Sequence, residues 1–160
     1  MGADIQLLNE QVVGGEKVAD IRVRSSQLSG INVPEEFVAL AIDEFPVLFV
    51  AAAYAKGKTV VSGAEELRVK ESDRIQTMAE GLQAIGVDAK ATPDGMIING
   101  GVVQGGEIES FDDHRIAMAF AVAGLQAKTT IKINNCENVA TSFPSFVQLA
   151  TDCGFNIAAQ

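Results

Sequence analysis

The charged stretch from Arg68 to Arg74 holds the residue types and spacing that best fit a chemical role. It places three cations and two carboxylates within seven residues, in a chain whose formal net charge is −9. Asp73, followed three residues later by Gln76, resembles a capping box, so the stretch should end at the N-terminus of a helix. Backbone N–H groups and the helix dipole favour an anion there, whereas the cations of Lys70 and Arg74 oppose the dipole unless an anion binds between them. The stretch therefore indicates an anion-binding site, with a solvated, self-neutralising charge cluster as the alternative.

A second polar group, Asp112 to Arg115, precedes an apolar segment that should form a buried helix. We expect Asp112 and Asp113 to cap this helix and to position Arg115. Arg115 has no other charged residue beside it in the helix, and its charge opposes the dipole, which favours a ligand-binding role. His114 is the single histidine. It is expected to be structural, with a supporting role beside Arg115 as the alternative.

The elements that must position these residues alternate between strands and helices. Asp43 is expected to cap a buried helix over 46–55, because Pro46 suits the first turn of a helix. Hydrophobic periodicity and turn residues predict the remaining helices over 73–85, 116–125 and 143–152. Strands are expected over 5–13, 19–23, 59–61, 87–91, 96–99, 129–133 and 155–158, with a polar loop over 134–142.

The composition fits one α/β domain and argues against several classes of function. The 160 residues are 48% hydrophobic and 21% charged, and a chain of this length can bury a sizeable core. The acidic balance argues against nucleic acid or an anionic membrane surface as a partner, since both need a basic face. Cys136, Cys153 and the single histidine lack metal-ligand spacing, so no metal site is expected and both thiols should be reduced. No apolar run is long enough to predict a membrane span.

The order of elements repeats within the chain. Asp43 and its buried helix are matched by Asp112 and a second buried helix, at an offset of about 69 residues, which indicates a duplicated α/β unit. Each copy reads helix, strand, helix, strand. Where the first copy carries the charges of 68–74, the second has the neutral residues 138–142. The fold alone does not require this asymmetry, so it favours a binding or catalytic role for the charged stretch.

Three motifs together resemble the EPSP synthase (3-phosphoshikimate 1-carboxyvinyltransferase) family. They are Leu-Arg-Val-Lys-Glu-Ser-Asp-Arg over 67–74, Phe-Asp-Asp-His-Arg-Ile-Ala-Met over 111–118 and Ala-Thr-Ser-Phe-Pro over 140–144. The segments 42–46 and 51–57 fit the same pattern. The resemblance implies an α/β (α+β) fold of repeated βαβαββ units in an inside-out, barrel-like domain. It further implies that the chain is a C-terminal portion, with two repeat units over about 1–100 and 101–160 and with the N-terminal domain absent.

The reaction that the resemblance implies joins the 5-hydroxyl of shikimate 3-phosphate to the enol carbon of phosphoenolpyruvate (PEP). It passes through a tetrahedral intermediate and then releases phosphate. Two highly anionic substrates must be held together, which calls for several cationic side chains. Protons must also leave the hydroxyl and reach the PEP methylene, which calls for acids and bases near the reacting carbons. The implied partners are these two substrates and the N-terminal domain, with no cofactor, in the bacterial cytoplasm.

The resemblance also assigns roles to individual residues. Asp43 matches the carboxylate that contacts the shikimate 5-hydroxyl and accepts its proton. Glu71 matches the carboxylate implicated in proton transfer at the PEP methylene, and Lys70 matches a lysine near the shikimate. Arg74 and Arg115 match two arginines that grip PEP, a task for which the planar guanidinium suits carboxylate and phosphate better than an ammonium group does.

Two departures from the family pattern and two alternative functions remain open. Thr141 stands where many members place a lysine that contacts the PEP phosphate, and Glu66 stands where some have a phosphate-binding asparagine. One alternative is the sister enolpyruvyl transferase that acts on UDP-N-acetylglucosamine. The other is a non-catalytic domain that kept the fold, which would be expected to lose at least one of the two carboxylates and two arginines. Because the matching residues form one wall of a cleft, the isolated chain is predicted to be inactive.

Overall fold

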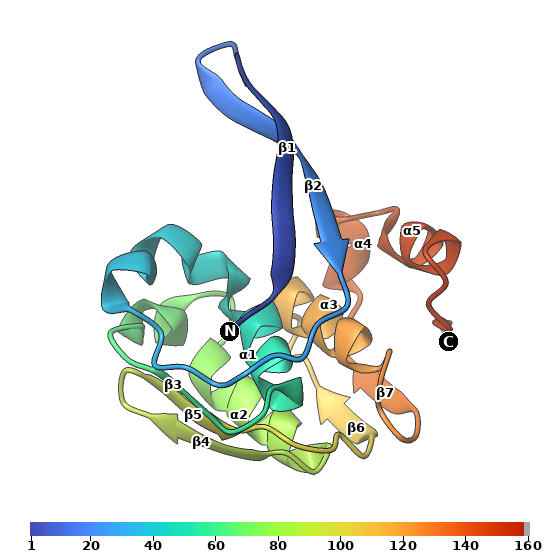
Figure 1. Cartoon of the computed structure of the whole chain (residues 1–160). Helices are drawn as coiled ribbons and strands as arrows, with labels where there is room; N and C mark the ends of the chain where they lie inside the picture. The colour runs from blue at the N-terminus through green and yellow to red at the C-terminus, as the bar shows by residue number, and fades with distance from the viewer. Residues whose placement is uncertain (159–160) are drawn as a thin grey trace.

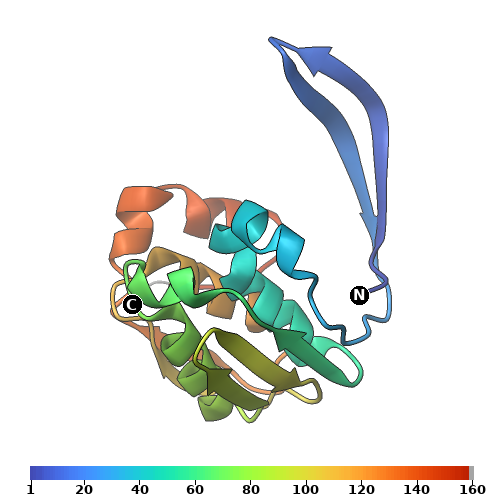
Figure 2. The ribbon, with the colours of Figure 1, turned by 90° about the vertical axis from the view of Figure 1, so that its left-hand side faces the viewer.

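The computed structural model describes residues 1–158 as an α/β body from which one β-hairpin projects (Figure 1). The hairpin consists of β1 (Asp4–Val13) and β2 (Glu16–Arg24), which pair antiparallel around the turn at 14–15. This confirms the hairpin predicted from the sequence. Two cross-strand pairs, Ile5 with Val23 and Leu7 with Ile21, are each more than half exposed. Figure 2 shows that the hairpin stands clear of the body from a second direction.

The helix α1 (Phe45–Tyr54) runs through the core, as its apolar sequence predicts. Phe45, Phe49 and Ala52 are all buried, and Pro46 occupies the first turn, where its missing N–H costs nothing. The predicted cap is wrong. Asp43 lies in the preceding 3₁₀ helix η2 (Ala39–Glu44), and Glu44 occupies the N-cap position without a side-chain bond. The charge of Arg74 attracts the Asp43 carboxylate away from the helix end.

The first copy of the repeat has the order βαβαββ. Residues 29–32 run parallel to β3 (Lys58–Val61), and α1 connects the two. The 3₁₀ helix η3 (Glu65–Val69) and α2 (Arg74–Ala84) follow, and then comes the hairpin of β4 (Asp88–Thr92) and β5 (Gly95–Asn99). The strands form a sheet in the order β3-β5-β4, antiparallel throughout, as the predicted hairpin requires.

The second copy repeats the beginning of that order. The strand β6 (Gly106–Glu109) pairs parallel with β7 (Ile131–Asn134), and α3 (His114–Ala123) connects them. The helices α1 and α3 pack against each other, and α2 packs on β4 and β6. The division of the chain near residue 100 into two units stays a prediction, because the hairpin β1–β2 stands outside both packed copies.

The C-terminal region differs from the sequence expectation in three places. The expected polar loop contains α4 (Asn138–Ser142), and the last helix, α5 (Phe146–Asp152), begins three residues late. The proline at 144 explains the delay, because it disfavours helical angles at Phe143, whose φ and ψ are −144° and 75°. Residues 155–158 form no strand, since no other strand of the described chain pairs with them. Across residues 1–158, none of the helices has the length and apolar character needed to cross a membrane.

Candidate functional site

Arg74 lies at the start of α2 and joins three carboxylates from separate parts of the chain. Asp73 caps the helix by accepting the Gln76 N–H at 3.0 Å, which confirms the predicted helix start. The Arg74 side chain is only 1% exposed. Its donors reach the acidic side chains as follows: Nε to Asp113 Oδ2 at 2.8 Å, Nη2 to Asp113 Oδ1 at 3.3 Å, Nη1 to Asp43 Oδ1 at 3.1 Å and Nη2 to Glu71 Oε2 at 2.6 Å.

Asp113 is the buried partner of Arg74 and also caps α3. Its carboxylate accepts the Arg115 N–H at 3.0 Å, as the sequence predicts, and the Ser72 hydroxyl at 3.0 Å. Burial alone would raise the pKa of the Asp113 carboxyl, but the hydrogen bond and charge of Arg74 hold that pKa below its ordinary value. Burial alone would lower the pKa of Arg74, but its bond to Asp113 and the three carboxylate charges raise it. Both groups of this pair therefore stay charged.

The other two carboxylates lie on the solvent side of Arg74. The side chains of Asp43 and Glu71 are 42% and 51% exposed. They cover the terminal nitrogens of the guanidinium, whereas Asp113 holds its inner edge. An anionic ligand can therefore reach Arg74 only by displacing Asp43 or Glu71, and each of these can turn into solvent without burying an unpaired charge.

Arg115 differs from Arg74 in that its ion pairs within residues 1–158 are long. Its side chain is 35% exposed, and its Nη1 donates to the backbone oxygen of Asp43 at 3.1 Å. The nearest carboxylate oxygens, on Asp43 and Glu44, are 3.6 and 3.9 Å away. Contacts of this length at the surface contribute little to stability. The guanidinium is held in place by a carbonyl and remains available to a ligand.

Lys70 completes the cluster. Its Nζ lies 3.9 Å from Asp43 Oδ1 and forms an ion pair with Glu66. The hydrogen bond to Glu66 raises the pKa of Lys70, with the charges of Glu66 and Asp43 adding to it. Asp43 is thus the common neighbour of Lys70, Arg74 and Arg115, and all five residues assigned from the sequence meet in one place.

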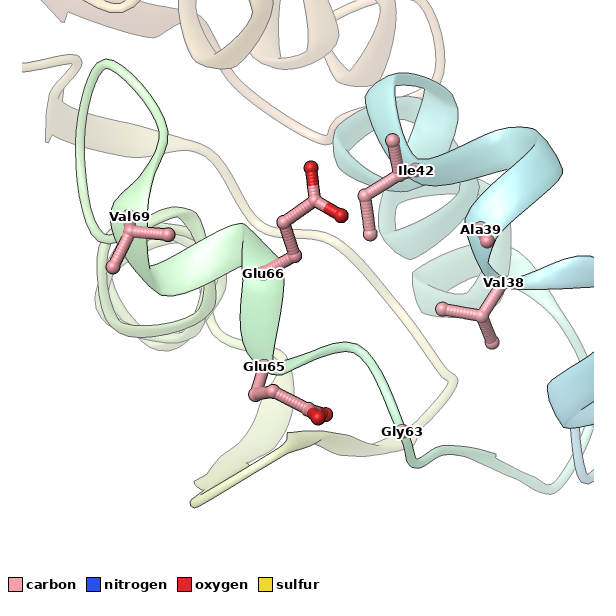
Figure 3. Close-up of a pocket in the computed structure, with 7 residues that line it drawn as sticks. All are labelled: Val38, Ala39, Ile42, Gly63, Glu65, Glu66 and Val69. Carbon is pink, nitrogen blue, oxygen red and sulfur yellow. The ribbon is translucent and has the colours of Figure 1, made fainter.

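Two shallow hollows flank this cluster. One, of about 430 Å³, is lined in part by Glu71, His114 and Thr141, the residue that stands where many family members have a lysine. The other, of about 350 Å³, lies between η2 and η3 (Figure 3). Its charged lining residues are Glu65 and Glu66, which would repel an anion. The hollow beside Glu71 also has acidic lining residues, Glu71 and Asp112, but it includes one of the five predicted site residues.

The contact between Asp113 and Arg74 was not foreseen from the sequence. Asp113 was assigned as a helix cap that positions Arg115, and the structure confirms the cap but adds a buried ion pair across 39 residues of chain. No local pattern signals a pairing at that separation. Arg68, in contrast, is not part of the cluster. Its guanidinium donates to the Asp73 side chain and to the backbone carbonyl oxygens of residues 92 and 93.

The βαβαββ order, with carboxylates and cations gathered at helix N-termini, is that of an enolpyruvyl-transferase-type domain. The family model of EPSP synthase (3-phosphoshikimate 1-carboxyvinyltransferase) matches residues 1–149. The chain belongs to that family, which confirms the resemblance of the motifs.

Individual relatives agree with this assignment. The chain is 62% identical to the 3-phosphoshikimate 1-carboxyvinyltransferase of Hydrogenovibrio crunogenus, over 99% of the chain and 36% of the relative. It is 63% identical to that of Nitrosococcus oceani, over 99% of the chain and 35% of the relative. The solved EPSP synthase of Acinetobacter baumannii superimposes with a TM-score of 0.96 at 54% identity, covering 100% of this chain and 38% of that one. The chain thus spans little more than a third of the length of these relatives.

Proposed function

We propose that this chain supplies one wall of a site that transfers the enolpyruvyl group of PEP to the 5-hydroxyl of shikimate 3-phosphate. The observation that carries the proposal is the convergence of Lys70, Arg74 and Arg115 on Asp43, at distances of 3.9, 3.1 and 3.6 Å between side chains. The name shared by the relatives supports the choice of reaction. Their bacterial sources support the bacterial cytoplasm as the compartment.

Two carboxylates would handle the protons. Asp43 would accept the proton of the attacking hydroxyl as the new C–O bond forms at the enol carbon of PEP. Glu71 would serve the methylene carbon, which gains a proton in the addition and loses one when the phosphate leaves. Both side chains are about half exposed, and each accepts one hydrogen bond from Arg74. They can therefore move to a substrate, as general acid–base groups must.

The arginines would hold PEP. Arg115 already presents a half-exposed guanidinium with loose carboxylate contacts. Arg74 would contribute its terminal nitrogens once an anion displaces Asp43 or Glu71. That exchange would bring the ligand in and release a carboxylate for proton transfer in the same step.

The cluster carries no excess of positive charge before any substrate arrives. Three cations, Lys70, Arg74 and Arg115, face the carboxylates of Asp43, Glu71 and Asp113, and Glu66 adds a fourth carboxylate beside Lys70. Two phosphorylated substrates would add several negative charges to it. Further cations must come from the part of the family protein that the chain does not match, and we therefore expect the chain alone to be inactive.

A chimera tests the proposal. The matching C-terminal portion of the Hydrogenovibrio crunogenus protein is replaced by this chain, and phosphate release from PEP is measured with shikimate 3-phosphate. We expect turnover by the chimera and none by the chain alone. Glu107→Gln alters a surface ion pair with Lys132 and a hydrogen bond from the Asn134 side chain, both at 2.9 Å. It is the control variant and should keep full activity.

The same assay separates the alternatives. Phosphate release with UDP-N-acetylglucosamine in place of shikimate 3-phosphate would support the sister transferase. A folded chimera without turnover on either acceptor would support a non-catalytic domain and refute the proposal.

A further inference from the structure

Asp113 has every acceptor position in use. Its Oδ2 accepts from Arg74 Nε at 2.8 Å and from the Ser72 hydroxyl at 3.0 Å. Its Oδ1 accepts from the Arg115 backbone N–H at 3.0 Å and from Arg74 Nη2 at 3.3 Å. A carboxylate offers about four lone-pair positions, so these four bonds saturate it. The residue is also fully buried. Asp113 therefore has no capacity to bind a substrate and can act only through the groups that it holds.

Those groups are the two arginines assigned to PEP. Asp113 accepts hydrogen bonds from the side chain of Arg74 and from the backbone N–H of Arg115. One carboxylate therefore sets the positions of both arginines relative to each other. It accepts from Nε and Nη2 of the Arg74 guanidinium. Nη1 donates to Asp43, and Nη2 also donates to Glu71. A helix cap alone needs one acceptor oxygen for the N–H groups of the first turn. Asp113 uses three further bonds, which join the charged stretch of the first copy to α3 of the second.

We propose that Asp113 is a positioning residue for PEP binding, because it holds Arg74 and Arg115 at a fixed spacing. The proposal rests on the function proposed above and adds a residue to it. The proposal predicts which of the two substrates is affected when Asp113 is replaced. Loss of the Asp113 charge should weaken the site for PEP, whose ligands are these arginines, and should leave the shikimate 3-phosphate contacts of Lys70 and Asp43 largely unchanged.

The test compares Asp113→Asn with Asp73→Asn. Both residues are helix N-caps, and asparagine caps as well as aspartate does, so the two substitutions are equal in that respect. Asp73 is partly exposed, with a side chain at 38%, and pairs with Arg68 rather than with Arg74. If Asp113 were only a cap, the two variants would behave alike.

The first readout is kinetic and uses the chimera. Asp113→Asn should raise the KM for PEP about tenfold or more, the size expected when a charged hydrogen bond is lost, and should change the KM for shikimate 3-phosphate by less than about twofold. Asp73→Asn should leave both values unchanged. A simple loss of folded protein would lower the apparent kcat and move neither KM. That pattern in Asp113→Asn would overturn the proposal.

The second readout uses the chain alone and needs no activity. The Nε–H of Arg74 is buried against Asp113, so its NMR signal should exchange slowly with water. Asp113→Asn should speed this exchange at least about tenfold, and Asp73→Asn should not. Equal protection in all three proteins would refute the positioning role. An inactive unsubstituted chimera would instead refute the proposed function, and the exchange rates would still decide whether Asp113 fixes Arg74.

Discussion

Arg74 in the first copy and Arg115 in the second both lie at the beginning of a helix, yet their surroundings differ. Each lies within the first two residues of a helix that an aspartate caps. The Arg74 side chain is 1% exposed and donates to three carboxylates. The Arg115 side chain is 35% exposed and donates to the backbone oxygen of Asp43, with carboxylate oxygens at 3.6 Å or more. An arginine at the start of an aspartate-capped helix is thus buried in the first copy, whereas its counterpart in the second copy is accessible to a ligand.

This difference separates two roles that the family motifs present as equal. Breaking a buried ion pair leaves an uncompensated charge in the interior, whereas breaking an exposed pair costs little. Arg74 should therefore matter for stability as well as for binding, and Arg115 mainly for binding. Substitutions at the two positions can break or sharpen this comparison.

The largest expected effect is on the stability of Arg74→Met. Methionine retains much of the apolar stem but leaves Asp113 buried without its cation, which should lower the free energy of unfolding by about 3–5 kcal/mol. Arg115→Met should lower it by less than about 1 kcal/mol. Urea unfolding of both variants at pH 7 gives the values, provided that the m-value stays unchanged. Similar losses for the two variants would show that the burial of Arg74 has no energetic consequence.

The next prediction concerns Arg115, whose replacement should lower activity and leave stability unchanged. In the chimera, Arg115→Ala should reduce kcat/KM for PEP by about 10²-fold while the unfolding transition stays in place, because an electrostatic contact to the substrate is lost. Glu107→Gln is again the control. If unfolding accounts for the lost activity, Arg115 is a structural residue and the comparison fails.

The sequence was sufficient to predict a group of residues that converge in the structure, but not the contacts among them. The charged motif, the Asp-Asp-His-Arg motif and the segment 42–46 indicated the five residues that converge. Each of the three lies at the beginning of a helix, and these helices pack together. The burial of Arg74 depends on Asp113, which lies 39 positions away. Nothing local to either residue specifies which of several nearby carboxylates becomes the buried partner.

The secondary structure was likewise predictable where local residues decide it, and not where distant residues do. Periodicity predicted α1, α2, α3 and the hairpin β4–β5, whose residues carry their own turn and capping signals. The errors arose where a remote group decided the outcome. Asp43 was assigned to a helix cap but bonds to Arg74, and 155–158 had a strand pattern without a strand to pair with.

A third prediction concerns pH and the buried pair. The folded pKa of Asp113 lies below its unfolded value of about 3.9, so its stabilising contribution is fully present above about pH 4. That contribution declines as the pH falls through the folded pKa. Asp113→Asn should therefore lower the free energy of unfolding by about 1.5–3 kcal/mol at pH 6, and the gap to the original chain should narrow below pH 4.

The measurement is urea unfolding of both proteins at several pH values between 2 and 7. The other carboxylates are present in both proteins, so their contributions largely cancel in the difference. A gap that stays constant over this range would mean that the charge of Asp113 does not stabilise the fold.

The smallest effect tests whether helix packing, rather than Asp113, sets the spacing of the two arginines. Gly81 of α2 lies against Phe120 of α3, and a Cβ at Gly81 would come within 2.4 Å of the buried ring. Gly81→Ala should cost about 1–2 kcal/mol despite the better helix propensity of alanine, because the ring has no room to move. Gly101→Ala, where a Cβ meets no atom within 4 Å, is the matched control and should be close to neutral. If Gly81→Ala raises the KM for PEP in the chimera as much as Asp113→Asn does, the α2–α3 contact fixes Arg74 and Arg115. If it lowers stability and leaves KM unchanged, the carboxylate of Asp113 holds the two arginines in place even when the helices behind them are pushed apart.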